Sequence, residues 1–340
     1  MKILAIESSC DETAAAVVEN GTVILSNVVA TSHEMHEKYG GIVPEVAARR
    51  QLESIQPVIS EALKQANTDY QYIDALAVTV GPGLIGSLLI GVETAKTISM
   101  VTGKPIIPVN HVLAHMYANY VGNPDVKFPA ISLVVSGGHT ELYLVKNKQE
   151  LSWLGGTLDD AAGECFDKTA RLLGFGNGGG LAIQESASRA RLSGGSPMRR
   201  LPRPYLDKKN ELNFSFSGLK TAILREVNAL KTQKRFDNTT ISQLSYEVQE
   251  TITDVLIKKT VRAAEKFGVQ SILLSGGVSA NLRLREKFKT YDNRYTVHVP
   301  PVALCTDNAV YIAGYAFFRG KPTPWQEITA APDLSVEISS

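Results

Sequence analysis

The chain has 340 residues, a length that corresponds to about two domains of the usual size. Hydrophobic residues make up 44% of it and charged residues 20%, which excludes a disordered chain, and the net charge is +1. Three widely spaced cysteines, Cys10, Cys165 and Cys305, exclude a disulfide framework and indicate a reducing compartment, so we expect a cytoplasmic protein. The most apolar stretch, residues 73–101, is interrupted by glycine, proline and acidic residues, so we expect no membrane span.

The first third of the chain alternates between strand and helix patterns. In chain order we expect strands at 2–6, 14–18 and 22–29, a helix at 44–66 that Pro57 kinks or divides, a strand at 73–80, a helix at 84–101 and a strand at 105–109. Asn110 follows the last of these strands and is a good N-cap, so a further helix is expected to begin at His111. Strands that alternate with helices indicate an α/β protein.

The strand order of the N-terminus recurs later in the chain. We expect strands at 131–135, 141–145 and 150–154, a helix that ends near 173 and begins with a capping box of Thr157 and Asp160, a strand at 271–274, a helix from 280 and a last apolar helix at 309–318. Because the same strand–turn–strand unit opens both halves, we predict two similar lobes that face each other across a cleft.

Three polar turns follow apolar strands and are expected to point into that cleft. They are residues 7–13, 136–140 and 275–277, and the last two contain Gly-Gly pairs. Backbone N–H groups in such turns form anion-binding nests, and glycine lets a phosphate approach the backbone closely. Three such turns at matching strand ends favour a nucleotide-binding cleft over ordinary tight turns.

His111 and His115 are four residues apart on an expected helix, so both side chains can face one metal ion. The zinc-protease version of this spacing needs a glutamate directly after the first histidine, and this chain has Val112 there. A third ligand must come from elsewhere, and Asp307, at the start of the last helix, is a candidate. The alternative is that both histidines lie on a helix surface and that Asp307 only caps a helix.

A strongly basic segment extends from Arg189 to Arg235. It holds twelve lysines and arginines but three acids, a local net charge of +9. In a nearly neutral protein such a segment indicates a polyanionic partner, although a solvated surface insertion has the same composition. Tyr205, Phe214 and Phe216 lie within the segment, where aromatic rings either stack on unpaired bases or pack in a core.

Ordered motifs between Lys2 and Gly320 carry a resemblance to a known family. The motifs are 6–13 (IESSCDET), 41–47 (GIVPEVA), 81–91, His111 with His115, 136–140 (SGGHT), 166–170 (FDKTA), 213–221 (NFSFSGLKT), 275–281 (SGGVSAN) and 305–308 (CTDN). Together they resemble the tRNA N6-adenosine threonylcarbamoyltransferases, a family formerly described as O-sialoglycoprotein endopeptidases or glycoproteases. Three segments depart from the family's usual pattern: residues 177–181 have lost both prolines of Tyr-Pro-Gly-Gly-Pro, Gln184 replaces an acid, and Arg50-Gln51 replaces a segment that usually carries a histidine.

The resemblance implies the actin-like, sugar-kinase-like ATPase fold, an α/β fold with two similar lobes around a nucleotide cleft. We expect an N-terminal lobe at 1–128, joined by the C-terminal helix at 308–320. The C-terminal lobe is expected at 129–307 with the basic insertion at 189–235, and a tail at 321–340.

The resemblance also implies a reaction, which moves a threonylcarbamoyl group from threonylcarbamoyl-AMP to N6 of adenosine 37 in tRNAs that read ANN codons and releases AMP. By resemblance, one divalent metal ion, iron in preference to zinc, is held by His111, His115 and Asp307. The donor is expected to contact Val134, Val135, Ser136, Gly137, Gly138, Asp167, Gly180 and Asn281. The polyanion is then tRNA, for which the basic segment offers Arg199, Arg200, Arg203, Lys208 and Lys209.

The implied protein partners are an inactive paralogue of the same fold and a P-loop ATPase. Three other functions are weighed against this one: a metallopeptidase, a small-molecule kinase of the same fold, and an inactive scaffold. The absence of a glutamate after His111 counts against the peptidase. The kinase would need neither the histidine pair nor the basic segment, and the scaffold would not need to keep His111, His115 and Asp307.

Overall fold

The computed structural model describes residues 1–31, 43–122, 124–176, 179–192, 201–203, 212–291 and 294–338. The chain forms two compact units. Unit 1 consists of Met1–Val126, Lys146–Leu151 and Pro300–Ser340, and unit 2 consists of Lys127–Val145 and Ser152–Val299. Residues 300–307, which we expected in the C-terminal lobe, lie in unit 1, as does the expected tail at 321–340.

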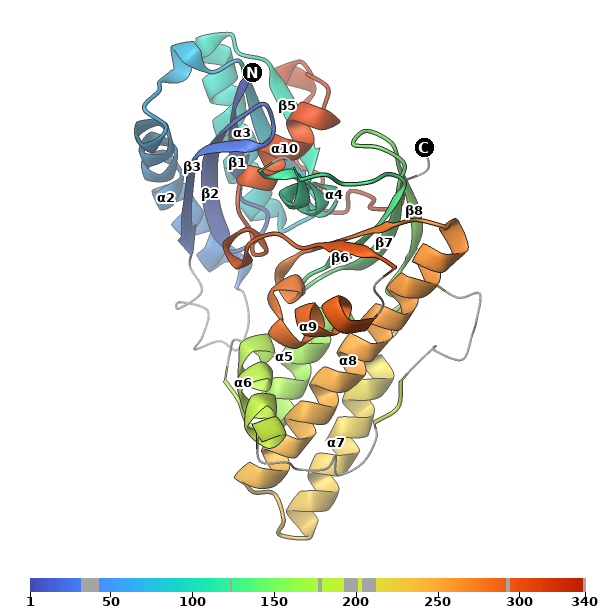
Figure 1. The fold of residues 1–340 in the computed structure, drawn as a ribbon. Coiled ribbons are helices and arrows are strands. Elements are labelled where there is room, and N and C mark those ends of the chain that lie inside the picture. Colours follow the sequence, from blue (N-terminus) through green and yellow to red (C-terminus); the bar gives the residue numbers. More distant parts are fainter. Residues whose placement is uncertain are drawn as a thin grey trace. The chain divides into compact units, whose positions relative to one another are not determined.

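Unit 1 is built on a five-stranded mixed sheet in the order β3-β2-β1-β4-β5 (Figure 1). Its strands are β1 (Lys2–Glu7), β2 (Glu12–Glu19), β3 (Val23–Thr31), β4 (Ala75–Gly81) and β5 (Ile106–Asn110). Strand β1 pairs antiparallel with β2 and parallel with β4, which pairs parallel with β5. The central strands are buried along nearly their whole length, because apolar side chains occupy both faces.

Helices α2 (Pro44–Gln65) and α3 (Ile85–Thr102) share an apolar core with this sheet. Helix α2 begins at Pro44. Proline has no backbone N–H, but the first residues of a helix have no intrahelical acceptor for that group, so no hydrogen bond is lost. It runs through Pro57 as one helix, so the proline does not divide it as the sequence allowed. A one-turn 3-10 helix, η2 (Tyr70–Tyr72), leads into β4.

The C-terminal part of the chain returns to unit 1. Helix α10 (Val310–Phe318), red in Figure 1, contacts β1, β2, β4 and β5 and also the short helix α4 (His111–Ala114). Helix α4 continues as the 3-10 helix η3 (His115–Tyr120). Two more 3-10 turns, η5 (Val302–Leu304) and η6 (Trp325–Glu327), lie on either side of α10 in the sequence. This packing brings the residues before α10 next to those of α4.

Unit 2 repeats the same sheet plan in the order β10-β9-β6-β7-β8. Its strands are β6 (Ala130–Val135), β7 (Thr140–Val145), β8 (Leu151–Gly156), β9 (Ser271–Ser275) and β10 (Thr296–His298). Strand β6 pairs antiparallel with β7 and parallel with β9, as β1 does with β2 and β4. The predicted α/β class and the predicted duplication are therefore confirmed.

Among its described residues, unit 2 also contains the helices α5 (Ala162–Leu172), α6 (Gly179–Leu192), α7 (Ser217–Thr232), α8 (Asn238–Phe267) and α9 (Leu282–Tyr291). Helix α8 contacts β6 and β9, helices α5, α6 and α9 contact α8, and α7 contacts α5. The 30-residue helix α8, which the sequence analysis did not assign, begins with a capping box of Asp237 and Thr240 and ends at Gly268 in the left-handed region. Its buried residues form much of the unit 2 core with α5 and α7.

Two local predictions in unit 2 are wrong. Helix α5 has no side-chain N-cap, because it begins after Ala161; Thr157 and Asp160 lie in the preceding turn, where the Thr157 hydroxyl donates to the Asp160 carbonyl. Residues 277–280 form a separate 3-10 turn, η4 (Gly277–Ala280), and α9 begins only at Leu282. Within the described ranges, no helix combines the length and the apolar character that crossing a membrane requires.

Candidate metal centre and nucleotide site

Helix α4 and the 3-10 helix η3 that continues it place two histidines beside each other in unit 1. The side chain of Asn110 accepts hydrogen bonds from the backbone N–H groups of Val112 and Leu113, so Asn110 is the predicted N-cap. His111 and His115 then fall one turn apart, with ring centroids separated by 4.7 Å. Both are buried, which rules out the alternative that they lie on a helix surface.

Asp307 completes a group of three ligand atoms. Its Oδ1 lies 3.7 Å from Nε2 of His111 and 3.5 Å from Nε2 of His115. Among the described residues, these three side chains bring their nitrogen and oxygen atoms within 4.8 Å of one another. Metal bonds to such atoms are about 2.1 Å long, which places two ligands of one ion about 3–3.5 Å apart. The donor set and its spacing therefore fit a metal ion.

Glu7, at the end of β1, orients His111. Its Oε2 accepts from Nδ1 of His111 at 3.1 Å and from the hydroxyl of Thr79 at 2.5 Å. Its Oε1 accepts from the backbone N–H of Ser9 at 2.6 Å. A carboxylate that accepts from Nδ1 keeps the proton there and leaves the Nε2 lone pair for a metal. Nε2 is the atom that faces Asp307.

We refer to Glu7, Glu12, His111, His115 and Asp307 as the His–Asp cluster. Burial and the charges of Asp307 and Asp11 raise the pKa of Glu12 to about 10, and burial also raises the pKa of Asp307. Burial opposes the charged form of His111, but the charges of Glu7 and Asp307 outweigh it and raise its pKa to about 9. A divalent cation would relieve this excess of buried negative charge and displace a proton from His111.

Tyr311, on the first turn of α10, also belongs to this environment. Its hydroxyl donates to Oδ1 of Asp307 at 3.3 Å, and its ring centroid lies 4.5 Å from that of His115. Neither Tyr311 nor Glu7 was expected from the sequence as a partner of the histidines. Glu7 did carry a signal, because it is an acid at the end of an apolar strand, where a buried charge needs a partner.

In unit 2, the two glycine turns come from neighbouring parallel strands. Strands β6 and β9 pair with Val134 opposite Ser275, so the turns 136–138 and 276–277 leave the sheet at the same edge. Gly276 has φ 84°, and a Cβ there would collide with the carbonyl oxygen of Val135, so the two turns touch backbone to backbone. Around Gly137 and Gly138, by contrast, the space that a Cβ would occupy is open.

The remaining predicted donor contacts lie on elements that meet these turns. The carbonyl oxygens of Ser136 and Gly137 accept from the first backbone N–H groups of α5, and η4 contacts both β6 and α5. At the start of α6, a Cβ on Gly179 would lie 2.6 Å from Cα of Asp167, so α6, whose second residue is Gly180, begins beside Asp167. Val134 and Val135 are fully buried strand residues, which can offer a ligand only their backbone.

The basic segment is only partly described. Arg199, Arg200, Lys208, Lys209 and Tyr205 lie outside the described residues. Arg203 donates to Asp254 at 2.8 Å and is 21% exposed, so its guanidinium is already engaged. Phe214 and Phe216 are fully buried, with stacked rings 6.3 Å apart, which settles their role as core residues and not as a surface for bases.

The fold matches solved structures of low sequence identity. Component A of (R)-2-hydroxyglutaryl-CoA dehydratase from Acidaminococcus fermentans is 15% identical with a TM-score of 0.54, over 93% of this chain and 98% of that one. HypF from T. kodakarensis is 14% identical with a TM-score of 0.59, over 93% of this chain and 47% of that one. This likeness, with the duplicated sheet, places the chain in the class of actin-like, sugar-kinase-like ATPase folds.

Sequence comparisons identify the family within that class. The model for tRNA N6-adenosine threonylcarbamoyltransferase matches residues 23–314. A protein of that name from Persephonella marina is 46% identical over 95% of this chain and 92% of its own length. One from Thermosipho africanus is 44% identical over 99% of this chain and all of its own length. The chain belongs to the tRNA N6-adenosine threonylcarbamoyltransferase family, whose members are transferases.

Proposed function

We propose that this chain transfers a threonylcarbamoyl group from threonylcarbamoyl-AMP to N6 of adenosine 37 in tRNAs that read ANN codons. The observation that carries the proposal is the His–Asp cluster, assembled from distant parts of a chain that belongs to this transferase family. In the reaction, a bond forms between N6 and the carbamoyl carbon, and the bond from that carbon to the AMP oxygen breaks. AMP leaves with the bonding electrons, and the amine gives up one proton.

His111, His115 and Asp307 would hold one divalent metal ion, for which we favour iron over zinc. The ion would supply a Lewis acid with open positions for substrate oxygens. The chain's own contribution begins with Glu7, which sets the tautomer of His111, and Tyr311, whose hydroxyl donates to the Asp307 carboxylate. These partners hold the ligands in place before substrate arrives, so little reorganisation accompanies binding.

The adenylate half of the donor would bind at the glycine turns of unit 2. Val134–Gly138 would offer backbone N–H groups, and Asp167, Gly180 and Asn281 would fix the nucleoside. The open space over Gly137 and Gly138 supports this, because a phosphate needs a backbone that it can approach closely. The mixed anhydride already carries a good leaving group, so the enzyme's main task is to align the donor with a weakly nucleophilic amine.

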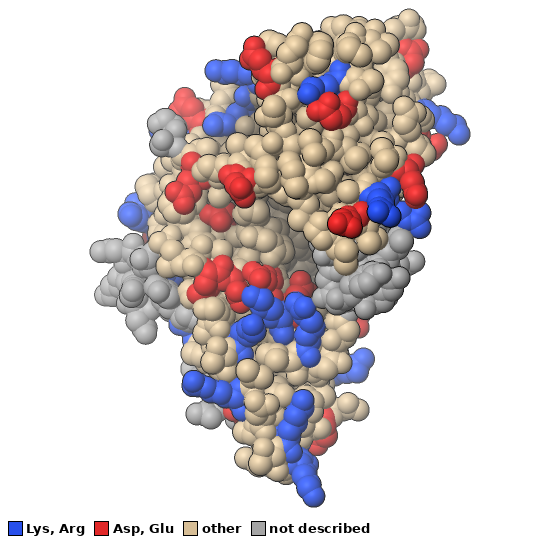
Figure 2. Space-filling view, turned by 180° about the vertical axis from the view of Figure 1, so that it is seen from behind, with Lys and Arg blue, Asp and Glu red and all other residues tan. Residues whose placement is uncertain are grey.

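We further propose that tRNA contacts the basic segment through Arg199, Arg200, Lys208 and Lys209. Support comes from the described part of the same segment, where Arg225, Lys231, Lys234 and Arg235 are exposed. Figure 2 shows Lys and Arg side chains along the helical part of unit 2 on the face that it draws. Arg203 would take part only by giving up its ion pair with Asp254.

The tRNA contact is tested by salt dependence. Arg199→Ala combined with Arg200→Ala should weaken tRNA binding. The slope of the logarithm of the binding constant against the logarithm of the salt concentration should become shallower by about 0.7–0.9 for each lost phosphate contact. A matched control removes two exposed lysines of unit 1, Lys64→Ala with Lys321→Ala, and should leave the slope unchanged. An unchanged slope in the arginine variant would place the tRNA site elsewhere.

The activity would be exercised in the cytoplasm, with an inactive paralogue of the same fold and a P-loop ATPase as protein partners. The decisive assay is mass spectrometry of tRNA nucleosides after incubation of unmodified tRNA with this chain, those partners, threonine, bicarbonate, ATP and the donor-forming enzyme. We expect N6-threonylcarbamoyladenosine at position 37. Two results would contradict the proposal. ATP-dependent phosphorylation of a small acceptor without modified nucleoside would indicate the kinase, and peptide cleavage without modified nucleoside would indicate the peptidase.

A further inference from the structure

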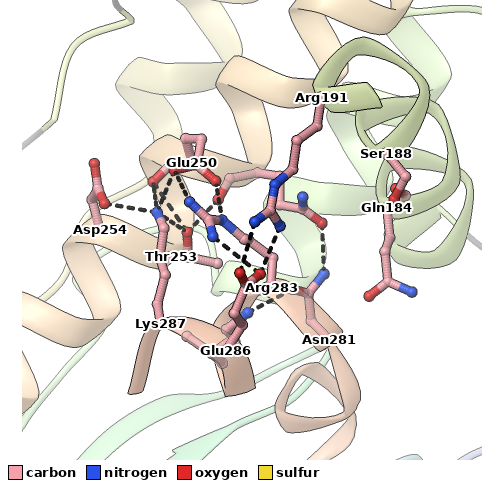
Figure 3. Close-up of polar contacts among 12 residues, drawn as sticks. Gln184, Ser188, Arg191, Glu250, Thr253, Asp254, Asn281, Arg283, Glu286 and Lys287 are labelled. Carbon is pink, nitrogen blue, oxygen red and sulfur yellow. Dashed lines mark hydrogen bonds and ion pairs between the residues drawn. The ribbon is translucent and has the colours of Figure 1, made fainter. Parts of the chain in front are cut away.

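Helix α9 begins directly after Asn281, one of the proposed donor contacts, and polar side chains connect this point to α6 and α8 (Figure 3). Oδ1 of Asn281 accepts from the backbone N–H of Leu284 at 3.0 Å, so Asn281 is the N-cap of α9. Its Nδ2 donates to Oε1 of Gln249 on α8 at 3.1 Å. The backbone N–H of Leu282 donates to Oε1 of Gln184 on α6 at 2.7 Å.

The two partners of Asn281 define which way its amide points. If the Asn281 amide were reversed while Gln249 kept its oxygen toward it, two oxygens would face each other there, and the Asn281 N–H groups would face the N–H of Leu284. Gln249 is well placed for this task, because it is only 4% exposed and lies inside the long helix α8. One N–H of the Asn281 amide is used on Gln249, and the other remains for a ligand.

Charged side chains hold α9 against its neighbours just beyond this point. Arg283 donates to both oxygens of Glu250 at 2.6 and 3.1 Å, and Lys287 lies 2.8 Å from Glu250 and 2.8 Å from Asp254. On the α6 side, Arg191 donates to both oxygens of Glu286 at 2.7 Å. We call these six residues the α9 clamp: Arg191, Glu250, Asp254, Arg283, Glu286 and Lys287. Gln249 directly precedes Glu250, so it projects from a part of α8 that the clamp fixes to α9.

We propose that Gln249 is a positioning residue that sets the amide of Asn281 for the adenylate donor. The ring nitrogens, ribose oxygens and phosphate oxygens of an adenylate are mostly hydrogen-bond acceptors, so the group it needs from Asn281 is an N–H. By accepting one N–H, Gln249 fixes the direction of the other. The inference rests on the proposed donor site and adds to it a residue that does not itself touch the ligand.

A double-mutant cycle on AMP binding tests this role. In Gln249→Met the shape is kept and the acceptor is lost, and the dissociation constant for AMP, measured by calorimetry on the full chain, should rise about fivefold to tenfold. In an Asn281→Ala background the same change should alter the constant by less than about twofold, because a residue that acts through Asn281 has nothing left to position. Steady-state assays with the full reaction mixture should show a raised KM for the donor.

Two further variants separate positioning from packing. Thr253→Val removes another hydrogen bond between α8 and α9, the one at 2.8 Å to Lys287, without touching Asn281, and should bind AMP like the wild type. Gln249→Glu keeps an oxygen facing Asn281 and should stay within about threefold of the wild type. The inference is overturned if Gln249→Met binds AMP normally, if it weakens binding equally with and without Asn281, or if Gln249→Glu binds as poorly as Asn281→Ala. Wild-type protein that fails to bind AMP would instead contradict the proposed donor site.

Discussion

The His–Asp cluster of unit 1 and the α9 clamp of unit 2 are both rich in carboxylates, but their charges are balanced in opposite ways. In the clamp, Arg283 and Lys287 outweigh burial and hold the pKa of Glu250 below its ordinary value, and Arg191 lowers the pKa of Glu286 to about 2. In the His–Asp cluster, burial and neighbouring acids raise the pKa of Glu12 to about 10, and burial raises the pKa of Asp307. Glu7 is the exception in this cluster, because the charge of His111 outweighs burial and lowers its pKa.

The difference separates a structural cluster from a binding site. A carboxylate whose pKa is lowered already has its cations, and it serves to join elements. A buried carboxylate whose pKa is raised costs free energy in its charged form. A fold retains such a carboxylate where a bound ligand compensates the charge. Clamp carboxylates should therefore matter for stability, and Glu12 and Asp307, whose pKa values are raised, should matter for metal binding.

Loss of a histidine from the His–Asp cluster should have the largest effect. In His115→Ala we expect the metal to be released and transfer to fall by at least a hundredfold, because ligands of one site act as a unit. Elemental analysis and the tRNA nucleoside assay measure the two quantities on the same sample. A variant that keeps its metal and activity would return His115 to the role of a packing residue.

Glu7→Gln should have a smaller but specific effect. The glutamine amide can donate to Nδ1 of His111 and so shift the imidazole proton to Nε2, where it blocks the ligand atom. Loss of such an outer partner typically lowers metal affinity by about 10–100-fold. Competition with a chelator gives the affinity, and Thr79→Val, which removes a different hydrogen bond to Glu7, serves as the control. Equal affinity in Glu7→Gln and wild type would show that His111 needs no orientation.

The same change, aspartate to asparagine, should lower the free energy of unfolding in the clamp but not in the His–Asp cluster. Asp254→Asn loses pairs with Lys287 and Arg203 and should lower the free energy of unfolding by about 1 kcal/mol. In metal-free protein, Asp307→Asn removes a charge that burial disfavours and should leave stability equal or slightly higher. Urea unfolding in the presence of a chelator measures both. Destabilisation of equal size would remove the distinction between the two regions.

Mild acid should lower the contribution of the clamp to the free energy of unfolding. The loss should be about 1 kcal/mol or less in total, because the ion pairs of the clamp are partly exposed. The pKa values of Glu250 and Asp254 are lowered in the folded state, so their stabilisation is present above their ordinary values near about 4 and is lost as the pH falls below them. Urea midpoints of the wild type between about pH 6 and pH 3 should fall more steeply than those of Glu250→Gln. Parallel curves would mean that Glu250 contributes nothing through its charge.

Much of the fold could be predicted because the local signals agreed with the tertiary structure. The hairpin strands, the cap at Asn110 and the glycine turns after β6 and β9 carry their structure in short sequence patterns. Helix α8 was missed because it has polar residues on several sides that are buried by tertiary packing, among them Gln249 and Lys259, so its pattern is not that of a surface helix.

The site was predictable to the level of its ligands but not of their partners. The spacing of His111 and His115 indicates a shared helix face, whereas Asp307 was only one candidate until the packing of α10 on α4 placed it. No pattern connects Glu7 to His111 or Gln249 to Asn281, since these pairs lie 104 and 32 residues apart and meet only through the fold.

The central claim is that Asp307, with the two histidines, holds a metal that the transfer reaction needs. The most direct measurement is metal content per chain and yield of N6-threonylcarbamoyladenosine for Asp307→Asn, beside Asp254→Asn as the matched change in the clamp. We predict that Asp254→Asn keeps its metal and transfers normally, while Asp307→Asn folds, loses the metal and forms no modified nucleoside. An Asp307→Asn protein with wild-type metal content and normal transfer would contradict the account.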